Sequence, residues 1–166
     1  ASSCVLASFS VAAHQEKASS NEVKAAEQEA KPAEQEAKIA EQEIAPLSRN
    51  GDETGVKFDN GKVTTAPGYK QAFNTYVEGG WTSLGGEPEF GGMGMPKMLT
   101  ALHEEMLCSA DISFSLYPGL TAGAGLSLAK HGSEELKNRY LTRMYAGEWS
   151  ATMCLTEAHA GTDLGM

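Results

Sequence analysis

The chain has 166 residues, of which 41% are apolar and 21% charged, and its formal net charge is −9. This length fits one ordinary domain with its own core, and the composition is typical of a globular protein. The negative charge is spread along the chain without any basic cluster, which argues against nucleic acid or an anionic membrane surface as a partner.

The cysteines and the apolar runs indicate the cellular environment. Cys4, Cys108 and Cys154 are widely spaced and form no CxxC pair, which favours unpaired thiols in a reducing compartment. The apolar surroundings of Cys154 predict a packed thiol rather than a nucleophile. No apolar run reaches the roughly 18 residues of a membrane helix, so we expect no membrane span. Residues 1–13 lack a basic flank and an initiator Met, so we interpret them as the start of a fragment rather than a signal peptide.

A seven-residue repeat fills residues 26–46. Its small apolar side chains fall on one helical stripe, formed by Ala26, Ala30, Ala33, Ala37, Ala40 and Ile44. Pro32 should break the first repeat, so we predict the helix over residues 32–45. An alanine stripe buries little area. This favours a helix docked on the domain, preceded by a solvated tail, over the alternative of an oligomerisation helix.

The next segments combine turn residues with one clear helix. Residues 48–68 predict a loop, with a short hairpin around the turn at residues 59–61. A helix is predicted over residues 67–78, ended by two glycines, with an apolar face of Tyr69, Phe73, Tyr76 and Val77. Residues 81–96 are rich in glycine but lack the strand–loop–helix pattern of a phosphate-binding loop, so we interpret them as a rigid connector.

From Pro96 onward the pattern is helical. The first helix carries an apolar stripe of Met98, Leu99, Leu102, Met106 and Leu107. Residues 110–130 are apolar on most sides, which is typical of a buried central helix, and Pro118-Gly119 marks where it would break. Ser133 should cap a third helix that ends near Gly147. Helices precede any strand and no βαβ alternation occurs, so we predict a mainly α fold and exclude a Rossmann sheet.

The last dozen residues combine a strand-like start with a polar turn. Residues 149–155 alternate like a strand, and the turn that follows crowds hydroxyls and backbone N–H groups together up to Asp163. Such a surface suits the polar edge and diphosphate of a nucleotide cofactor. We interpret His159 as a surface or hydrogen-bonding residue. His103 and the two glutamates after it lack a second ligand pair, so we expect no metal site.

Several motifs in this order resemble the acyl-CoA dehydrogenase family. The runs YLTRMYAGEW (residues 140–149) and MCLTEAHAGTD (residues 153–163) are similar to the signature between the family's helical and middle β-barrel domains. GGW and PEFGG resemble its connector, and GSEELK resembles the turn after its central helix. YPGLT at residues 117–121, together with His159, looks most like the branch of the 3-methylmercaptopropionyl-CoA dehydrogenases.

The resemblance implies a domain organisation. Residues 1–31 would be a poorly ordered tail, and residues 32–148 the N-terminal helical domain. Residues 149–166 would form the first strand and turn of a truncated middle β-barrel domain.

The resemblance also implies FAD as the cofactor. Thr156 would donate its hydroxyl to the pyrimidine edge of the flavin, and the backbone at Met153 and Leu155 would run along that edge. Gly161 and Thr162 would face the diphosphate, with Thr162 also near the CoA end of the substrate.

Three further residues belong to this turn. Glu157 and Asp163 would stabilise it, because ionised carboxylates do not bond usefully to a diphosphate. Ala158 stands where the family has a proline. Alanine does not fix φ, so the unfolded chain has more conformational entropy and the turn is less stable by about 0.4–1 kcal/mol.

The implied reaction is α,β-dehydrogenation of an acyl-CoA thioester, with 3-methylthiopropanoyl-CoA as a candidate substrate. Electrons would pass to an electron-transfer flavoprotein. The full-length protein would be a homo-oligomer of the bacterial cytoplasm or the mitochondrial matrix.

In the family the base is a glutamate of the C-terminal helical domain, expected beyond Met166. We therefore name no catalytic residue and expect the fragment alone to be inactive, with poor FAD retention. The alternatives are an acyl-CoA oxidase or flavin monooxygenase of the same fold, or a non-catalytic helical interaction fragment.

Overall fold

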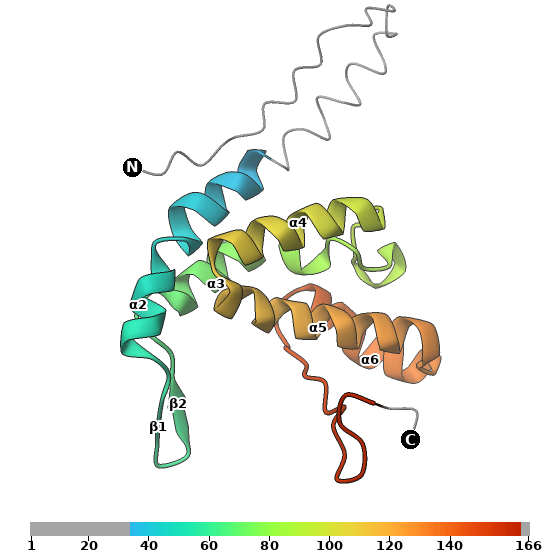
Figure 1. Ribbon diagram of the computed structural model, residues 1–166. Coiled ribbons are helices and arrows are strands. Elements are labelled where there is room, and N and C mark those ends of the chain that lie inside the picture. Colours follow the sequence, from blue (N-terminus) through green and yellow to red (C-terminus); the bar gives the residue numbers. More distant parts are fainter. Residues whose placement is uncertain (1–33, 164–166) are drawn as a thin grey trace, which may run out of the picture. The chain divides into compact units, whose positions relative to one another are not determined.

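The computed structural model describes residues 34–163, which form a set of packed helices and one small hairpin (Figure 1). A helix over residues 34–39 continues into the π-helical turn η1 (Ala40–Ile44). The elements that follow are α2 (Leu47–Thr54), β1 (Lys57–Asp59), β2 (Lys62–Thr64), α3 (Tyr69–Glu78), the 3₁₀ turns η2 (Trp81–Ser83) and η3 (Pro88–Phe90), α4 (Lys97–Ala110), α5 (Ile112–His131) and α6 (Glu134–Tyr145). The mainly α fold is confirmed. No helix in residues 34–163 is long and apolar enough to cross a membrane.

The helix that precedes α2 is docked on the domain. Ile39 and Ile44 are buried in the main core, whose other members are Ala72, Tyr76, Trp81, Leu84, Leu107 and Phe114. Ala40, on the predicted stripe, is also buried. The docked helix is therefore confirmed over residues 34–44. The earlier part of the repeat, the break at Pro32, the tail and Cys4 lie outside the described residues.

The loop predicted from residue 48 is wrong at its start, where α2 forms instead. Asn50 donates its side-chain N–H to Pro67 O at 2.9 Å, and Arg49 pairs with Glu53 at 2.8 Å. Gly51, which favoured a loop in the sequence, lies against the ring of Tyr69, where a Cβ would clash. The close packing of Tyr69 therefore explains why position 51 is a glycine.

The hairpin is confirmed. Strands β1 and β2 pair antiparallel, with Phe58 opposite Val63. The turn residues Asn60 and Gly61 have φ of 47° and 79°, as a two-residue type I′ turn requires.

The apolar stripe predicted for α4 is confirmed at Leu107, which is buried, and wrong at Met98, Leu99 and Leu102, which are exposed. Met98 is 76% exposed, and the residues of α4 that are buried are His103 and Leu107. The helix turns this face inward because a polar residue, His103, finds buried partners there. The hydropathy pattern of one segment does not show that a polar side chain will find buried hydrogen-bond partners.

Helix α5 also differs from the buried central helix that we predicted. Phe114, Pro118, Gly125 and Ala129 form its buried face, whereas Leu116 is 61% exposed. The helix runs through Pro118 without ending.

The last helix and the connector agree with the predictions. Ser133 caps α6, because its hydroxyl accepts a hydrogen bond from Leu136 N at 3.4 Å. Helix α6 packs on α5 through a second core of Phe90, Ala129, Leu141 and Tyr145. Within residues 81–96, backbone bonds from Met93 N to Ser83 O (2.8 Å) and from Met95 N to Leu84 O (2.9 Å) fix the connector.

Candidate functional site

The turn singled out in the sequence lies at the exposed end of the described chain (Figure 1). Glu157 N donates to Ala160 O at 2.8 Å, and Ala160 N donates back to Glu157 O at 3.3 Å. These two bonds close a four-residue turn between Thr156 and Gly161.

The five residues predicted to contact a cofactor all belong to this exposed segment: Met153, Leu155, Thr156, Gly161 and Thr162. All five are exposed, within ten consecutive residues of the chain. Residues 150–155 run as an extended coil (Figure 1) that pairs with no strand of the described chain, so the strand predicted over residues 149–155 does not form there. A strand needs a neighbour to satisfy its N–H and C=O groups.

Helix α5 holds the start of this segment. Tyr117 Oη donates to Ser150 Oγ at 2.8 Å, and Ala151 N donates to Thr121 Oγ1 at 3.1 Å. Further on, a Cβ at Gly123 would meet Met153 Sδ at 3.6 Å. The segment therefore runs alongside α5 and parallel to it.

A small hollow of about 300 Å³ opens between α5 and the segment. It is lined by Ala124, Ser127 and Leu128 of α5 and by residues 152–155. One wall of this hollow is therefore the stretch that precedes Thr156.

Contacts between Arg143 and Trp149 lie where α6 leads into the segment. Arg143 lies over the ring of Trp149 at 4.5 Å from the centroid, and Trp149 N donates to Arg143 O at 3.2 Å. These contacts fix the exit from α6.

Cys154 is exposed, so the packed thiol that we predicted is wrong. Within the described chain, the extended segment has no strand beside it that could cover the side chain.

His103, the centre of the weak metal-like motif, takes part in a buried hydrogen-bond network. Its Nδ1 bonds to the carboxylate of Glu36, and its Nε2 lies 2.8 Å from Tyr76 Oη. Burial and the charges of Glu36 and Glu104 raise the pKa of Tyr76, so this phenol stays protonated and can donate. Within residues 34–163 no three His, Cys, Asp or Glu side chains gather as metal ligands. The burial of Glu36 had no signal in the sequence, because this residue stands among the alanines of the repeat.

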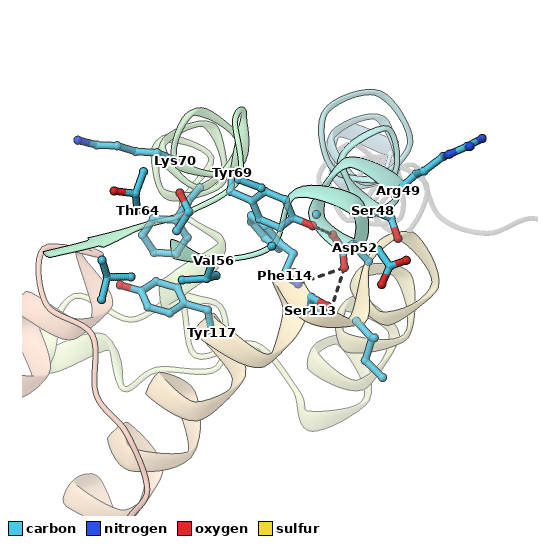
Figure 2. Close-up of a pocket in the computed structure, with 18 of the residues that line it drawn as sticks. Ser48, Arg49, Asp52, Val56, Thr64, Tyr69, Lys70, Ser113, Phe114 and Tyr117 are labelled. Atoms are coloured by element: carbon cyan, nitrogen blue, oxygen red, sulfur yellow. Dashed lines mark hydrogen bonds between the residues drawn. The ribbon is translucent and has the colours of Figure 1, made fainter. Parts of the chain in front are cut away.

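A larger hollow of about 1280 Å³, which the sequence did not predict, lies among α2, the hairpin, α3 and the start of α5 (Figure 2). At its floor Tyr69 donates a short hydrogen bond to Asp111, which also accepts from Ser113 N at 2.9 Å and Phe114 N at 3.3 Å. Burial, followed by this bond and the charge of Asp111, raises the pKa of Tyr69 to about 12. Figure 2 shows Arg49 and Lys70 extending away from the hollow. The polar groups on its floor are thus engaged with one another, and these two cations do not converge on it.

Comparison with known proteins identifies the family. The sequence profile described as "Acyl-CoA dehydrogenase, N-terminal domain" matches residues 25–148. The chain belongs to the acyl-CoA dehydrogenase family. It is 48% identical over 121 residues to the 3-methylmercaptopropionyl-CoA dehydrogenase of Ruegeria pomeroyi, covering 73% of this chain and 21% of that protein. It is 39% identical over 129 residues to a butyryl-CoA dehydrogenase of Syntrophomonas wolfei, covering 74% and 20%. The chain thus spans about a fifth of the length of these relatives, and the family resemblance seen in the motifs is confirmed.

A solved structure shares the helical fold. It is described as "Electron transferring flavoprotein of Acidaminococcus fermentans: Towards a mechanism of flavin-based electron bifurcation". The match has a TM-score of 0.66 at 24% identity and covers 82% of this chain and 33% of that chain. At this identity the likeness supports the fold assignment alone.

Proposed function

We propose that this chain provides the N-terminal helical domain and one wall of the cofactor site of an FAD-dependent acyl-CoA dehydrogenase. The observation that carries the proposal is the exposed turn with the Thr156 and Thr162 hydroxyls, which follows directly on the family's helical domain. The reaction is α,β-dehydrogenation of an acyl-CoA thioester.

The residues of the turn suit FAD chemically. Thr156 and Thr162 offer neutral hydroxyls, and Gly161 adds a backbone N–H without a side chain, all on the exposed surface. A Cβ at Gly161 would meet no described atom within 4 Å, so the packing of this chain does not require a glycine there. A cofactor that approaches the backbone closely does require one.

In this proposal the Thr156 hydroxyl and the backbone of Met153 and Leu155 bind the edge of the flavin. Gly161 and Thr162 bind the diphosphate, and Thr162 also lies near the CoA end of the substrate. When bound, FAD supplies the acceptor for the electrons that leave the acyl chain. We name no catalytic base among residues 34–163, where the buried Glu36 is engaged by His103.

For the substrate we propose 3-methylthiopropanoyl-CoA, because the relative with 48% identity is named for that thioester. For the electron acceptor we propose an electron-transfer flavoprotein, with the protein acting as a homo-oligomer in the cytoplasm. The substrate and the electron acceptor are tested separately from the general reaction.

The test uses the protein encoded by the complete reading frame. We expect it to purify with FAD, to lose flavin absorbance on addition of 3-methylthiopropanoyl-CoA, and to be reoxidised rapidly by an electron-transfer flavoprotein in stopped flow. Butyryl-CoA serves as the second substrate. Rapid reoxidation by oxygen instead would assign an oxidase or monooxygenase, and a protein without flavin would refute the proposal.

A further inference from the structure

Two side chains of α5 bond to the extended segment just before the turn. Tyr117 Oη donates to Ser150 Oγ at 2.8 Å, and the Thr121 hydroxyl accepts from Ala151 N at 3.1 Å. Thr121 Oγ1 also lies 3.4 Å from Ala151 O and from Tyr117 O, so its single proton is donated to one of these carbonyls. Four residues apart, Tyr117 and Thr121 lie on one face of α5.

These two side chains bond to consecutive residues of the segment. The Tyr117 bond holds a side chain, at Ser150, and the Thr121 bond holds the backbone, at Ala151. Together they fix both the position and the direction of the chain there. Because each extended residue adds about 3.3 Å, Met153 lies within roughly 7 Å of Ala151 and Thr156 within roughly 17 Å. A small change of direction at Ala151 therefore displaces Thr156 by much more.

The position of Tyr117 depends in turn on the main core. Its ring makes an edge contact with Phe73 of α3, with centroids 4.9 Å apart. Phe73 packs against that core. The chain of contacts therefore runs from the core through Phe73 and Tyr117 to Ser150.

We propose that Tyr117 and Thr121 are positioning residues that set the backbone of residues 150–151 and, through it, the place of the flavin-facing residues 153–156. This inference rests on the proposed function. The two residues touch neither cofactor nor reacting atoms in this scheme. They act by limiting the conformations of the segment before the cofactor binds, which reduces the entropy lost on binding.

The experiment measures FAD affinity and amide exchange in the protein from the complete reading frame. Thr121→Val removes the acceptor of the Ala151 N–H at nearly constant volume. We expect about fivefold weaker FAD binding, the loss that corresponds to one ordinary hydrogen bond. We also expect faster hydrogen exchange over residues 149–156. Thr121→Ser keeps the hydroxyl and should restore both values.

The Tyr117 bond is tested by a mutant cycle. Tyr117→Phe and Ser150→Ala each remove the same hydrogen bond, so each should weaken FAD binding similarly. The double variant should be no weaker than either single one.

Two matched controls remove similar groups elsewhere. Thr100→Val loses a hydroxyl that bonds to Lys97 O in α4, and Tyr69→Phe loses one that bonds to Asp111 at the start of α5. Both should leave the exchange of residues 149–156 unchanged. If the wild type carries flavin and Thr121→Val matches it in affinity and exchange, the positioning role is overturned while the proposed function stands. A wild type that takes up no flavin overturns both.

Discussion

His103 of α4 and Glu36 of the docked N-terminal helix form a buried hydrogen-bonded pair across 67 positions of sequence. Glu36 is 6% exposed and His103 5%, and Tyr76 occupies the other ring nitrogen of His103. The ring of Trp81 stacks on His103 with centroids 5.8 Å apart. This network joins the repeat-bearing helix to α3 and α4, and it gives the otherwise alanine-rich helix a specific place on the domain.

Glu36→Ala should therefore destabilise the domain strongly, because it leaves the His103 ring buried without its partner. We expect a loss of about 3 kcal/mol and a fall in melting temperature of about 10 °C. Circular dichroism melts of wild type and variant measure this. Glu43→Ala, at an exposed position on the same helix, is the control and should change little. Equal melting temperatures for Glu36→Ala and wild type would contradict a structural role for the pair.

The raised pKa of Tyr69 predicts that the protein loses stability at alkaline pH. Burial and the bond with Asp111 raise its pKa from 10.0 to about 12 in the folded protein. Its contribution to stability is thus fully present below pH 10 and is lost as the pH rises through about 12, because the unfolded chain ionises first. Melts between these pH values should show a shallower decline for Tyr69→Phe than for wild type. Parallel curves would show that the Tyr69–Asp111 bond does not shift this titration.

Two glycine substitutions should have opposite effects. In Gly92→Ala the new Cβ would overlap the backbone carbonyl of Gly86, so the connector cannot keep its hydrogen bonds. We expect a loss of about 3 kcal/mol or more from this overpacking. Gly119→Ala, in α5 with no atom near its Cβ, should gain up to about 1 kcal/mol from helix propensity. Urea unfolding of the two variants measures both values, and a neutral Gly92→Ala would show that the connector is not rigid.

Substitutions in the turn should change the affinity for FAD. Thr156→Val should weaken binding about tenfold, because the flavin edge loses a hydroxyl donor in a desolvated site. Thr65→Val, at an exposed position in a distant loop, is the matched control. An unchanged dissociation constant for Thr156→Val, measured by flavin fluorescence, would remove Thr156 from the cofactor site.

Ala158→Pro should act in the opposite direction. Ala158 is the second residue of the turn that Glu157 and Ala160 close, where proline is favoured. Pre-ordering the turn should stabilise it by about 0.4–1 kcal/mol and slow FAD release. Faster FAD release from this variant would mean that the bound turn differs from the one in the free chain.

The helices with clear local signals could be predicted from sequence. Ser133, with two glutamates after it, marks the start of α6, and Asn60-Gly61 sets the hairpin turn, because capping and positive φ depend on a few neighbouring residues. Similarly, the candidate site was recognisable because its residues are contiguous from Met153 to Thr162. A local turn needs no distant partner to bring them together.

Other features depend on contacts between distant residues. The inward face of α4 follows from the pairing of His103 with Glu36, and position 51 of α2 needs a glycine because the ring of Tyr69 packs on it. Hydropathy along one segment records neither partner. The sequence by itself determined the helical class, the local turns and the chemistry of the closing motif, because these rest on neighbouring residues. Only the tertiary structure decided which helix faces are buried and that α5 holds the closing segment, because both depend on partners up to 67 positions away.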